Sequence, residues 1–137
     1  MNREDILKME AGREMDVLIA ENVMGYSKML APTSFRLNNY LVDAGELVYV
    51  APNGDTFATF DIPSYSSDIS AAWEVVEKMR IAIVPLVGGG WAAEPDSDFD
   101  LELSWFERPV CDWATAPTAP LAICRAALLA AGITETP

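Results

Sequence analysis

The chain of 137 residues contains no histidine and only two cysteines. Histidine is the most common general base in enzymes and the most common protein ligand of metals, so its absence argues against hydrolase triads and zinc sites. Cys111 and Cys124 do not have the spacing of a metal-binding pair. We expect both to be free thiols in a reducing compartment.

Basic residues are scarce, with 9 lysines and arginines against 21 acidic residues and a net charge of -12. Non-specific binding to DNA or RNA depends on cations that neutralise phosphates, so this balance argues against a nucleic-acid partner. Carboxylates can also bind a hard cation. Asp96, Asp98 and Asp100 alternate with other residues, which suits either a calcium site or the solvated edge of a strand.

The sequence also lacks the apolar run of about 18 residues that crosses a bilayer. Its first residues, Asn2 to Asp5, do not have the basic start and apolar core of a secretory signal, so we expect a cytoplasmic protein without a membrane partner. A hydrophobic content of 51% over 137 residues is enough for one domain with a substantial core. We therefore predict a single domain over residues 1–137.

Apolar periodicity and turn residues predict an α+β fold, a largely antiparallel sheet with helices packed against it, in the order α-β-β-β-α-β-β-α. Gly12 lies inside the first predicted helix despite its low helix propensity, which we interpret as the close approach of another backbone. The predicted helices cover residues 3–24, 69–79 and 119–131, and the predicted strands cover 35–42, 46–50, 56–62, 81–87 and 99–105.

Residues 63–79 combine a helix with an unusual start. Helical spacing places Trp73 on an apolar stripe, so we expect its side chain in the core. Before the helix stand an aromatic ring, two hydroxyls and a carboxylate, contributed by Tyr65, Ser66, Ser67 and Asp68. Such a helix start either caps itself or binds a phosphate with its free N–H groups, and both interpretations remain open.

The last predicted helix is apolar on every side except at Arg125. A helix of this kind has to be covered on more than one face, by the sheet and by another helix or subunit. Burying the guanidinium costs several kcal/mol unless a carboxylate or a phosphate meets it. Arg125 is therefore either half of a structural ion pair or the centre of an anion site, for which arginine geometry is well suited. The glycine run 88–90 lacks the pattern of a phosphate-binding loop, so we interpret it as a flexible turn.

Three segments together resemble the small phage proteins with an ABA sandwich domain. They are GREMDVLIAENVMG at residues 12–25, YSSDISAAWEVVEK at 65–78 and TAPLAICRAALL at 118–129. That family includes the Thoeris anti-defence sponges, which sequester cyclic ADP-ribose messengers made by bacterial TIR enzymes. The resemblance implies a binding protein and not an enzyme, with no catalytic residues, metal or cofactor. It also implies a homo-oligomer, a dimer or an assembly of dimers, that holds an intact cyclic nucleotide in the cytoplasm of the infected cell.

Carried over to this sequence, the resemblance implies that Arg125 contacts a phosphate of the messenger. Tyr65, Ser66 and Ser67 would supply hydroxyls and helix N–H groups to a ribose or diphosphate, and Asp68 a cap or a ribose contact. Lys28 would add a positive charge. Trp91, which follows the glycine turn, is the preferred candidate for stacking on a base, and the other stacking candidates are Trp105, Phe106 and Trp113.

The charge also supports a function of a different class. A small acidic phage protein can bind a host protein directly, for example as a nucleic-acid mimic in the basic groove of a nuclease or polymerase. The net charge of -12 favours this alternative, whereas the helix cap and Arg125 favour a ligand pocket. The sequence leaves both alternatives in place.

Overall fold

The computed structural model describes residues 3–37, 39–95 and 114–131. The helices of this part of the chain are α1 (Arg3–Lys8), α2 (Arg13–Asn22), the 3-10 helix η1 (Thr59–Asp61), α3 (Ile69–Met79) and α4 (Ala119–Ala130). The strands are β1 (Ser27–Leu30), β2 (Phe35–Leu37), β3 (Tyr40–Val42), β4 (Leu47–Val50), β5 (Thr56–Ala58), β6 (Ile81–Pro85), β7 (Trp91–Pro95) and β8 (Ala114–Ala116).

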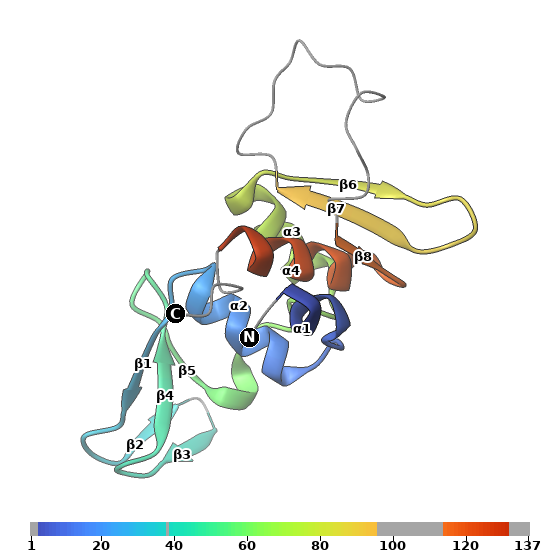
Figure 1. Cartoon of the computed structure of the whole chain (residues 1–137). Coiled ribbons are helices and arrows are strands. Elements are labelled where there is room, and N and C mark those ends of the chain that lie inside the picture. Colours follow the sequence, from blue (N-terminus) through green and yellow to red (C-terminus); the bar gives the residue numbers. More distant parts are fainter. Residues whose placement is uncertain (1–2, 38, 96–113, 132–137) are drawn as a thin grey trace.

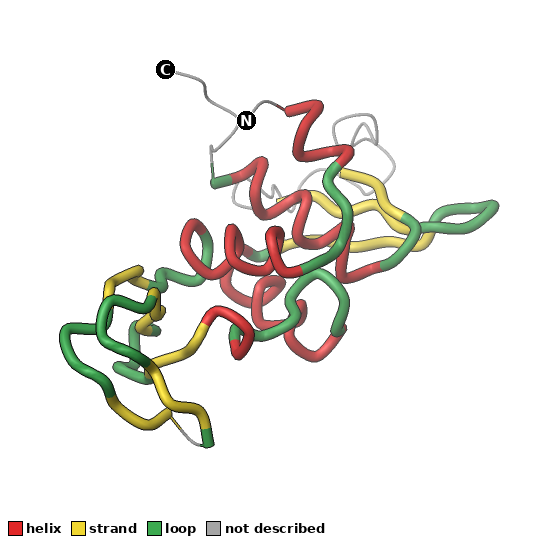
Figure 2. Tube along the Cα trace, turned by 90° about the horizontal axis from the view of Figure 1, so that it is seen from below, coloured by secondary structure: helices red, strands yellow, loops and turns green. Residues whose placement is uncertain are grey.

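The strand pairs among the described residues are antiparallel and are accompanied by helices, which confirms the predicted α+β class. The strands divide among three small sheets, with the orders β1-β4-β5, β2-β3 and β6-β7-β8. The predicted strand over residues 35–42 is a hairpin, because β2 turns back on β3 and Phe35 faces Val42. The first two sheets lie at one end of the molecule and the third at the other, with the four α-helices between them (Figures 1 and 2).

Helix α4 lies in the main core. Every residue from Pro120 to Leu128 is buried except Arg125, which is partly exposed. The helix packs against β6, β7 and β8 and against α1, α2 and α3. The prediction that its apolar surface is covered on more than one face is therefore confirmed within a single chain. Cys124 is a buried free thiol, and burial raises its pKa, so it remains protonated at neutral pH.

The first predicted helix is in fact two helices that are separated by residues 9–12, with Gly12 directly before α2. A Cβ atom added at Gly12 would meet nothing within 4 Å, so the expected close approach of another backbone was wrong. Glycine costs about 1 kcal/mol in a helix interior, which makes this position a weak point in the helical segment. The break leaves the Met9 carbonyl and the Gly12 N–H without an intrahelical partner, and Arg125 and Ser66 bind them.

Helix α3 begins and packs mostly as predicted. The Asp68 carboxylate accepts a hydrogen bond from the Ser70 N–H at 3.1 Å, which confirms the N-terminal cap. The prediction for Trp73 was wrong, because its side chain is 51% exposed. The inner face of α3 carries the small residues Ala71, Ala72 and Val75, which allow α3 to lie close to α4. Trp73, the residue after Ala72, lies outside this buried face.

Several predictions fall outside the described residues. They concern the strand over residues 99–105, the possible calcium ligands Asp96, Asp98 and Asp100, the thiol of Cys111, and the aromatic residues Trp105, Phe106 and Trp113. Strands β1, β7 and β8 were not predicted. The predicted strand over residues 56–62 ends at Ala58, where the 3-10 helix η1 begins. None of the helices in the described residues has the length and apolar character needed to cross a bilayer.

Candidate functional site

Arg125 lies near the middle of α4 and its guanidinium reaches two backbone segments. Nε and Nη2 donate to the Met9 carbonyl oxygen at 3.2 and 2.8 Å, and Nη1 donates to the Thr115 carbonyl oxygen at 2.8 Å. In an uninterrupted helix the Met9 carbonyl would accept the N–H of residue 13. The break between α1 and α2 therefore makes this carbonyl available to Arg125.

These hydrogen bonds do not supply a counterion for Arg125. Both interpretations from the sequence required a carboxylate or a phosphate, but the structure supplies carbonyl oxygens, which carry only partial charge. Among the described residues no carboxylate forms an ion pair with Arg125. Burial lowers its pKa, and the more distant Glu10 acts in the opposite direction. Arginine stays protonated in proteins, and one N–H on each of Nη1 and Nη2 has no partner in the described part of the chain.

A hollow of about 480 Å³ opens beside this guanidinium. Its volume is in the range of small-molecule sites, about 300–1,000 Å³. A Cβ atom added at Gly90 would lie 3.0 Å from the Ala116 carbonyl oxygen, and Gly90 has a φ of +87°, so only glycine fits there without strain. The residues that line this Arg125 hollow are Leu86, Gly89, Gly90, Thr115, Ala116, Pro117 and Arg125.

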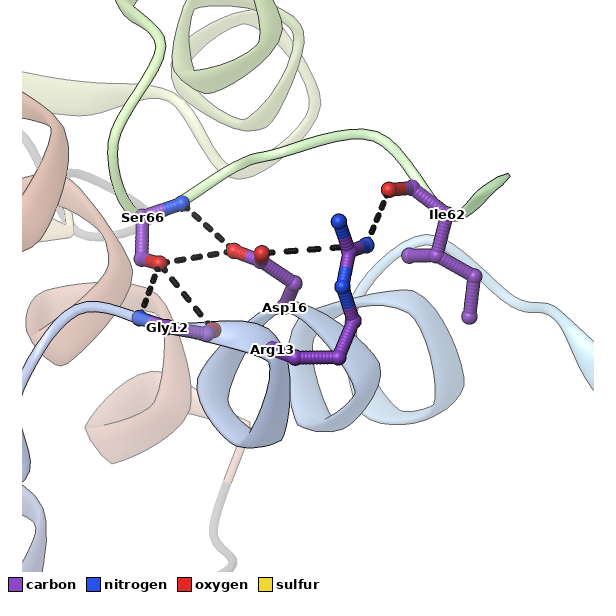
Figure 3. A network of polar contacts seen from close by, with 5 residues as sticks. All are labelled: Gly12, Arg13, Asp16, Ile62 and Ser66. Atoms are coloured by element: carbon purple, nitrogen blue, oxygen red, sulfur yellow. Dashed lines mark hydrogen bonds and ion pairs between the residues drawn. The ribbon is translucent and has the colours of Figure 1, made fainter. Parts of the chain in front are cut away.

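A second polar cluster, which we call the Asp16 network, lies between α2 and the start of α3 (Figure 3). The buried Asp16 carboxylate accepts the N–H of Ser66 at 2.8 Å and its hydroxyl at 2.7 Å. The Ser66 hydroxyl oxygen accepts the Gly12 N–H at 2.9 Å. Arg13 lies 3.8 Å from the second Asp16 oxygen and also donates to the Ile62 carbonyl.

The network shows how the protein uses the segment before α3. Ser66 is fully buried and is held by Gly12 and Asp16. Tyr65 is 1% exposed, its hydroxyl lies 3.4 Å from that of Tyr26, and burial raises its pKa. Asp68 caps α3, and Ser67 is exposed. The buried hydroxyls of this segment therefore bind other parts of the chain.

The model of the phage ABA sandwich domain matches residues 17–128. The chain belongs to this phage protein family. The matched range contains β1–β8, α3 and most of α4, as well as all seven predicted ligand-binding residues, whereas Gly12 and Asp16 precede it. The resemblance of the three segments is thus confirmed at the level of the family. No curated protein and no solved structure matches the chain.

Within this ABA sandwich domain the predicted binding residues lie in three separate places. Arg125 lines the hollow, and Trp91 directly follows Gly90 on β7 but packs its side chain against the main core. Tyr65 and Ser66 belong to the junction of α2 and α3. Lys28 is exposed on β1 and lies 3.7 Å from Glu21, and β1 is at the end of the molecule remote from β6–β8 (Figure 1).

Sequence reasoning did not identify the other walls of the hollow. Gly89 and Gly90 were interpreted as a flexible turn, and Thr115 was not considered. Gly90 lies near Ala116 because β7 pairs with β8 at Trp91↔Ala116. These residues are far apart in the sequence, so local sequence patterns do not predict that they pair. The Asp16 network was missed for the same reason, although Gly12 was a visible irregularity in a helical pattern.

Proposed function

We propose that this phage protein binds and sequesters an anionic cyclic nucleotide messenger of the cyclic ADP-ribose type, without degrading it. The family supports this proposal because it includes sponges of this kind. The single structural observation that carries it is Arg125, a cation without a counterion in the described part of the chain, at the wall of a hollow of about 480 Å³.

The chemistry of such a ligand suits this position. A diphosphate presents several anionic oxygens, and the outer N–H groups of a guanidinium bind two of them in a fork. The carbonyls of Met9 and Thr115 hold the guanidinium in place from the inner side, so little side-chain freedom is lost when a ligand binds. Sequestration needs only affinity, and a proton-transfer group is not part of the mechanism.

The remaining predicted residues have different positions in this proposal. Ser67, Asp68 and Lys28 are exposed, so they are open to a ligand that two copies of the chain share. Trp91 adjoins the hollow through Gly90. To contact a ligand directly, the hydroxyls of Tyr65 and Ser66 have to give up the hydrogen bonds that they make within the chain. Such a contact remains a prediction from the family resemblance.

The test is a depletion assay with cyclic ADP-ribose isomers. The purified protein is mixed with the messenger, the free messenger is measured, and the protein is then heated to release what it holds. We expect depletion followed by recovery of intact messenger. Linear ADP-ribose after heating would contradict sequestration, and an unchanged free concentration would contradict binding and favour direct inhibition of a host protein.

Arg125→Ala tests the observation that carries the proposal. Loss of two charge-assisted hydrogen bonds to phosphate, together about 3 kcal/mol, corresponds to a loss of affinity of roughly 100-fold by calorimetry. The matched control is Arg36→Ala, which removes an exposed arginine on β2 away from the hollow. Equal affinity of the folded Arg125→Ala variant and the unchanged protein would place the messenger elsewhere.

A further inference from the structure

The break between α1 and α2 results from a competition between two sets of hydrogen bonds. The apolar pattern of residues 3–24 is that of one helix. In a continuous helix the Gly12 N–H would donate to the carbonyl four positions earlier, and the Met9 carbonyl would accept the N–H four positions later. In the structure the Gly12 N–H binds the Ser66 hydroxyl, and the Met9 carbonyl accepts two N–H groups of Arg125. Tertiary contacts at both ends of the break therefore replace hydrogen bonds of the helix.

Ser66 holds the Gly12 end of the break (Figure 3). Its hydroxyl oxygen accepts the Gly12 N–H at 2.9 Å and lies 3.3 Å from the Gly12 carbonyl oxygen. The Asp16 carboxylate in turn accepts the Ser66 hydroxyl at 2.7 Å and the Ser66 N–H at 2.8 Å. Because Ser66 is fully buried and bound in this way, its hydroxyl has a fixed position. The hydroxyl therefore competes with the helix for the Gly12 N–H.

The two ends of the break are joined by a short segment. Met9 and Gly12 are three residues apart, and a stretch of this length spans about 10 Å at most. Glu10 and Ala11 between them are exposed. If Gly12 joined a continuous helix, the Met9 carbonyl would point along the helix axis at the next turn and away from Arg125. The hydrogen bonds at Gly12 and at Met9 therefore favour each other.

We propose that Ser66 is a positioning residue for Arg125. By binding the Gly12 N–H, the serine holds residues 9–12 outside the helix, and the Met9 carbonyl remains available to the guanidinium beside the hollow. In this role Ser66 supports messenger binding through Met9 and needs no contact with the messenger. The effect on affinity rests on the proposed function, whereas the effect on Arg125 itself does not.

Hydrogen exchange of the Arg125 Nε–H, measured by NMR without messenger, tests the positioning. In Ser66→Ala this group, which donates to the Met9 carbonyl at 3.2 Å, should exchange roughly fivefold faster, the factor expected for one weakened hydrogen bond. Ser67→Ala is the matched control, because it removes an exposed hydroxyl from the next residue. Val48→Ala, in a separate apolar cluster, is the control for lower stability alone.

Gly12→Ala tests the competition without removing a side-chain hydrogen bond. A Cβ atom added at Gly12 would meet nothing within 4 Å, so alanine fits in the broken segment, but its higher helix propensity favours the continuous helix. We expect faster exchange of the Arg125 Nε–H, as in Ser66→Ala. Circular dichroism shows whether each variant is folded, and Gly12→Ala decides the question if Ser66→Ala does not fold.

Calorimetry with a cyclic ADP-ribose isomer measures the consequence for binding. Ser66→Ala and Gly12→Ala should each bind roughly fivefold more weakly than the unchanged protein, and Ser67→Ala and Val48→Ala should bind equally well.

Two outcomes would overturn the positioning role of Ser66. In the first, the Arg125 Nε–H exchanges in the folded variants as it does in the unchanged protein. In the second, exchange becomes faster but affinity stays the same. If the unchanged protein does not bind the messenger at all, the proposed function fails, and the exchange rates still decide whether Ser66 positions Arg125.

Discussion

The Asp16 network and the Arg125 hollow use the same irregularity in different ways. Both bind backbone groups that the break between α1 and α2 releases: the Gly12 N–H binds Ser66, and the Met9 carbonyl binds Arg125. In the network a carboxylate meets an arginine and two donors of Ser66. At the hollow the hydrogen bonds of the guanidinium to other described residues go to carbonyl oxygens. The first site is satisfied by contacts within the chain, whereas at the second two guanidinium N–H groups have no partner among the described residues.

Burial explains why the two sites differ. Asp16 is 2% exposed, and a buried charge is tolerated only when it is paired and hydrogen-bonded. Arg125 is partly exposed, so water or a ligand reaches its outer N–H groups. A complete buried network is therefore expected to determine stability, and an incomplete, accessible cation is expected to determine binding.

Asp16→Ala is expected to lower the stability of the fold more than the other substitutions. The substitution leaves the N–H and hydroxyl of Ser66 without their buried acceptor and removes the carboxylate that faces Arg13. We expect the free energy of unfolding, measured in urea, to fall by about 3–5 kcal/mol. Glu14→Ala is the control, because Glu14 is an exposed carboxylate in the same turn of α2. A loss below 1 kcal/mol for Asp16→Ala would show that the network does not determine stability.

Ser66→Ala should have an intermediate effect. It removes the hydroxyl that accepts the Gly12 N–H and donates to Asp16, but it leaves the Ser66 N–H in place. We expect the free energy of unfolding to fall by about 1–3 kcal/mol. Its neighbour provides a matched control, since Ser67 is exposed and Ser67→Ala should change stability by about 0.5 kcal/mol at most. If Ser66→Ala and Ser67→Ala lowered the free energy of unfolding equally, the inference that the Ser66 hydroxyl stabilises the fold would be wrong.

The smallest effect on stability is expected from Arg125→Met, which keeps most of the apolar stem. Three hydrogen bonds to carbonyls are lost, but water can reach these carbonyls, so we expect a loss of about 1–2 kcal/mol in urea unfolding. The affinity of the same variant for the messenger should fall by roughly 100-fold, as for Arg125→Ala. A variant that loses 4 kcal/mol or more would instead mean that Arg125 holds the fold together as Asp16 does.

Local patterns predicted much of the fold. The periodicity and the carboxylate before residue 69 predicted α3 and its cap, and the uniform apolar composition predicted the burial of α4. Trp73 was assigned to the wrong environment, because periodicity defines a face but not the width of the contact that small residues such as Ala72 allow. The predicted length of the first helix was also wrong. The Gly12 N–H binds Ser66, which is more than 50 positions away along the chain, and local patterns do not show such a partner.

The candidate site was predictable only in its central residue. Arg125 stood out as the one charged residue in an apolar helix, and it lines the hollow. Its hydrogen-bond partners are the backbone carbonyl oxygens of Met9 and Thr115. Every residue has a backbone carbonyl, so the pattern of side chains in the sequence could not predict these partners. The proximity of Gly90 likewise comes from strand pairing.

The sequence by itself determined the helix cap at Asp68, the buried α4 with its single cation, and membership of the phage ABA sandwich family, because each depends on residues that are close together in the chain. Only the tertiary structure decided that Ser66 is bound by Asp16, whereas Arg125 lies beside a hollow with two N–H groups that no described residue binds. Those outcomes depend on which distant backbone groups the fold brings to each side chain, and on whether water can still reach it.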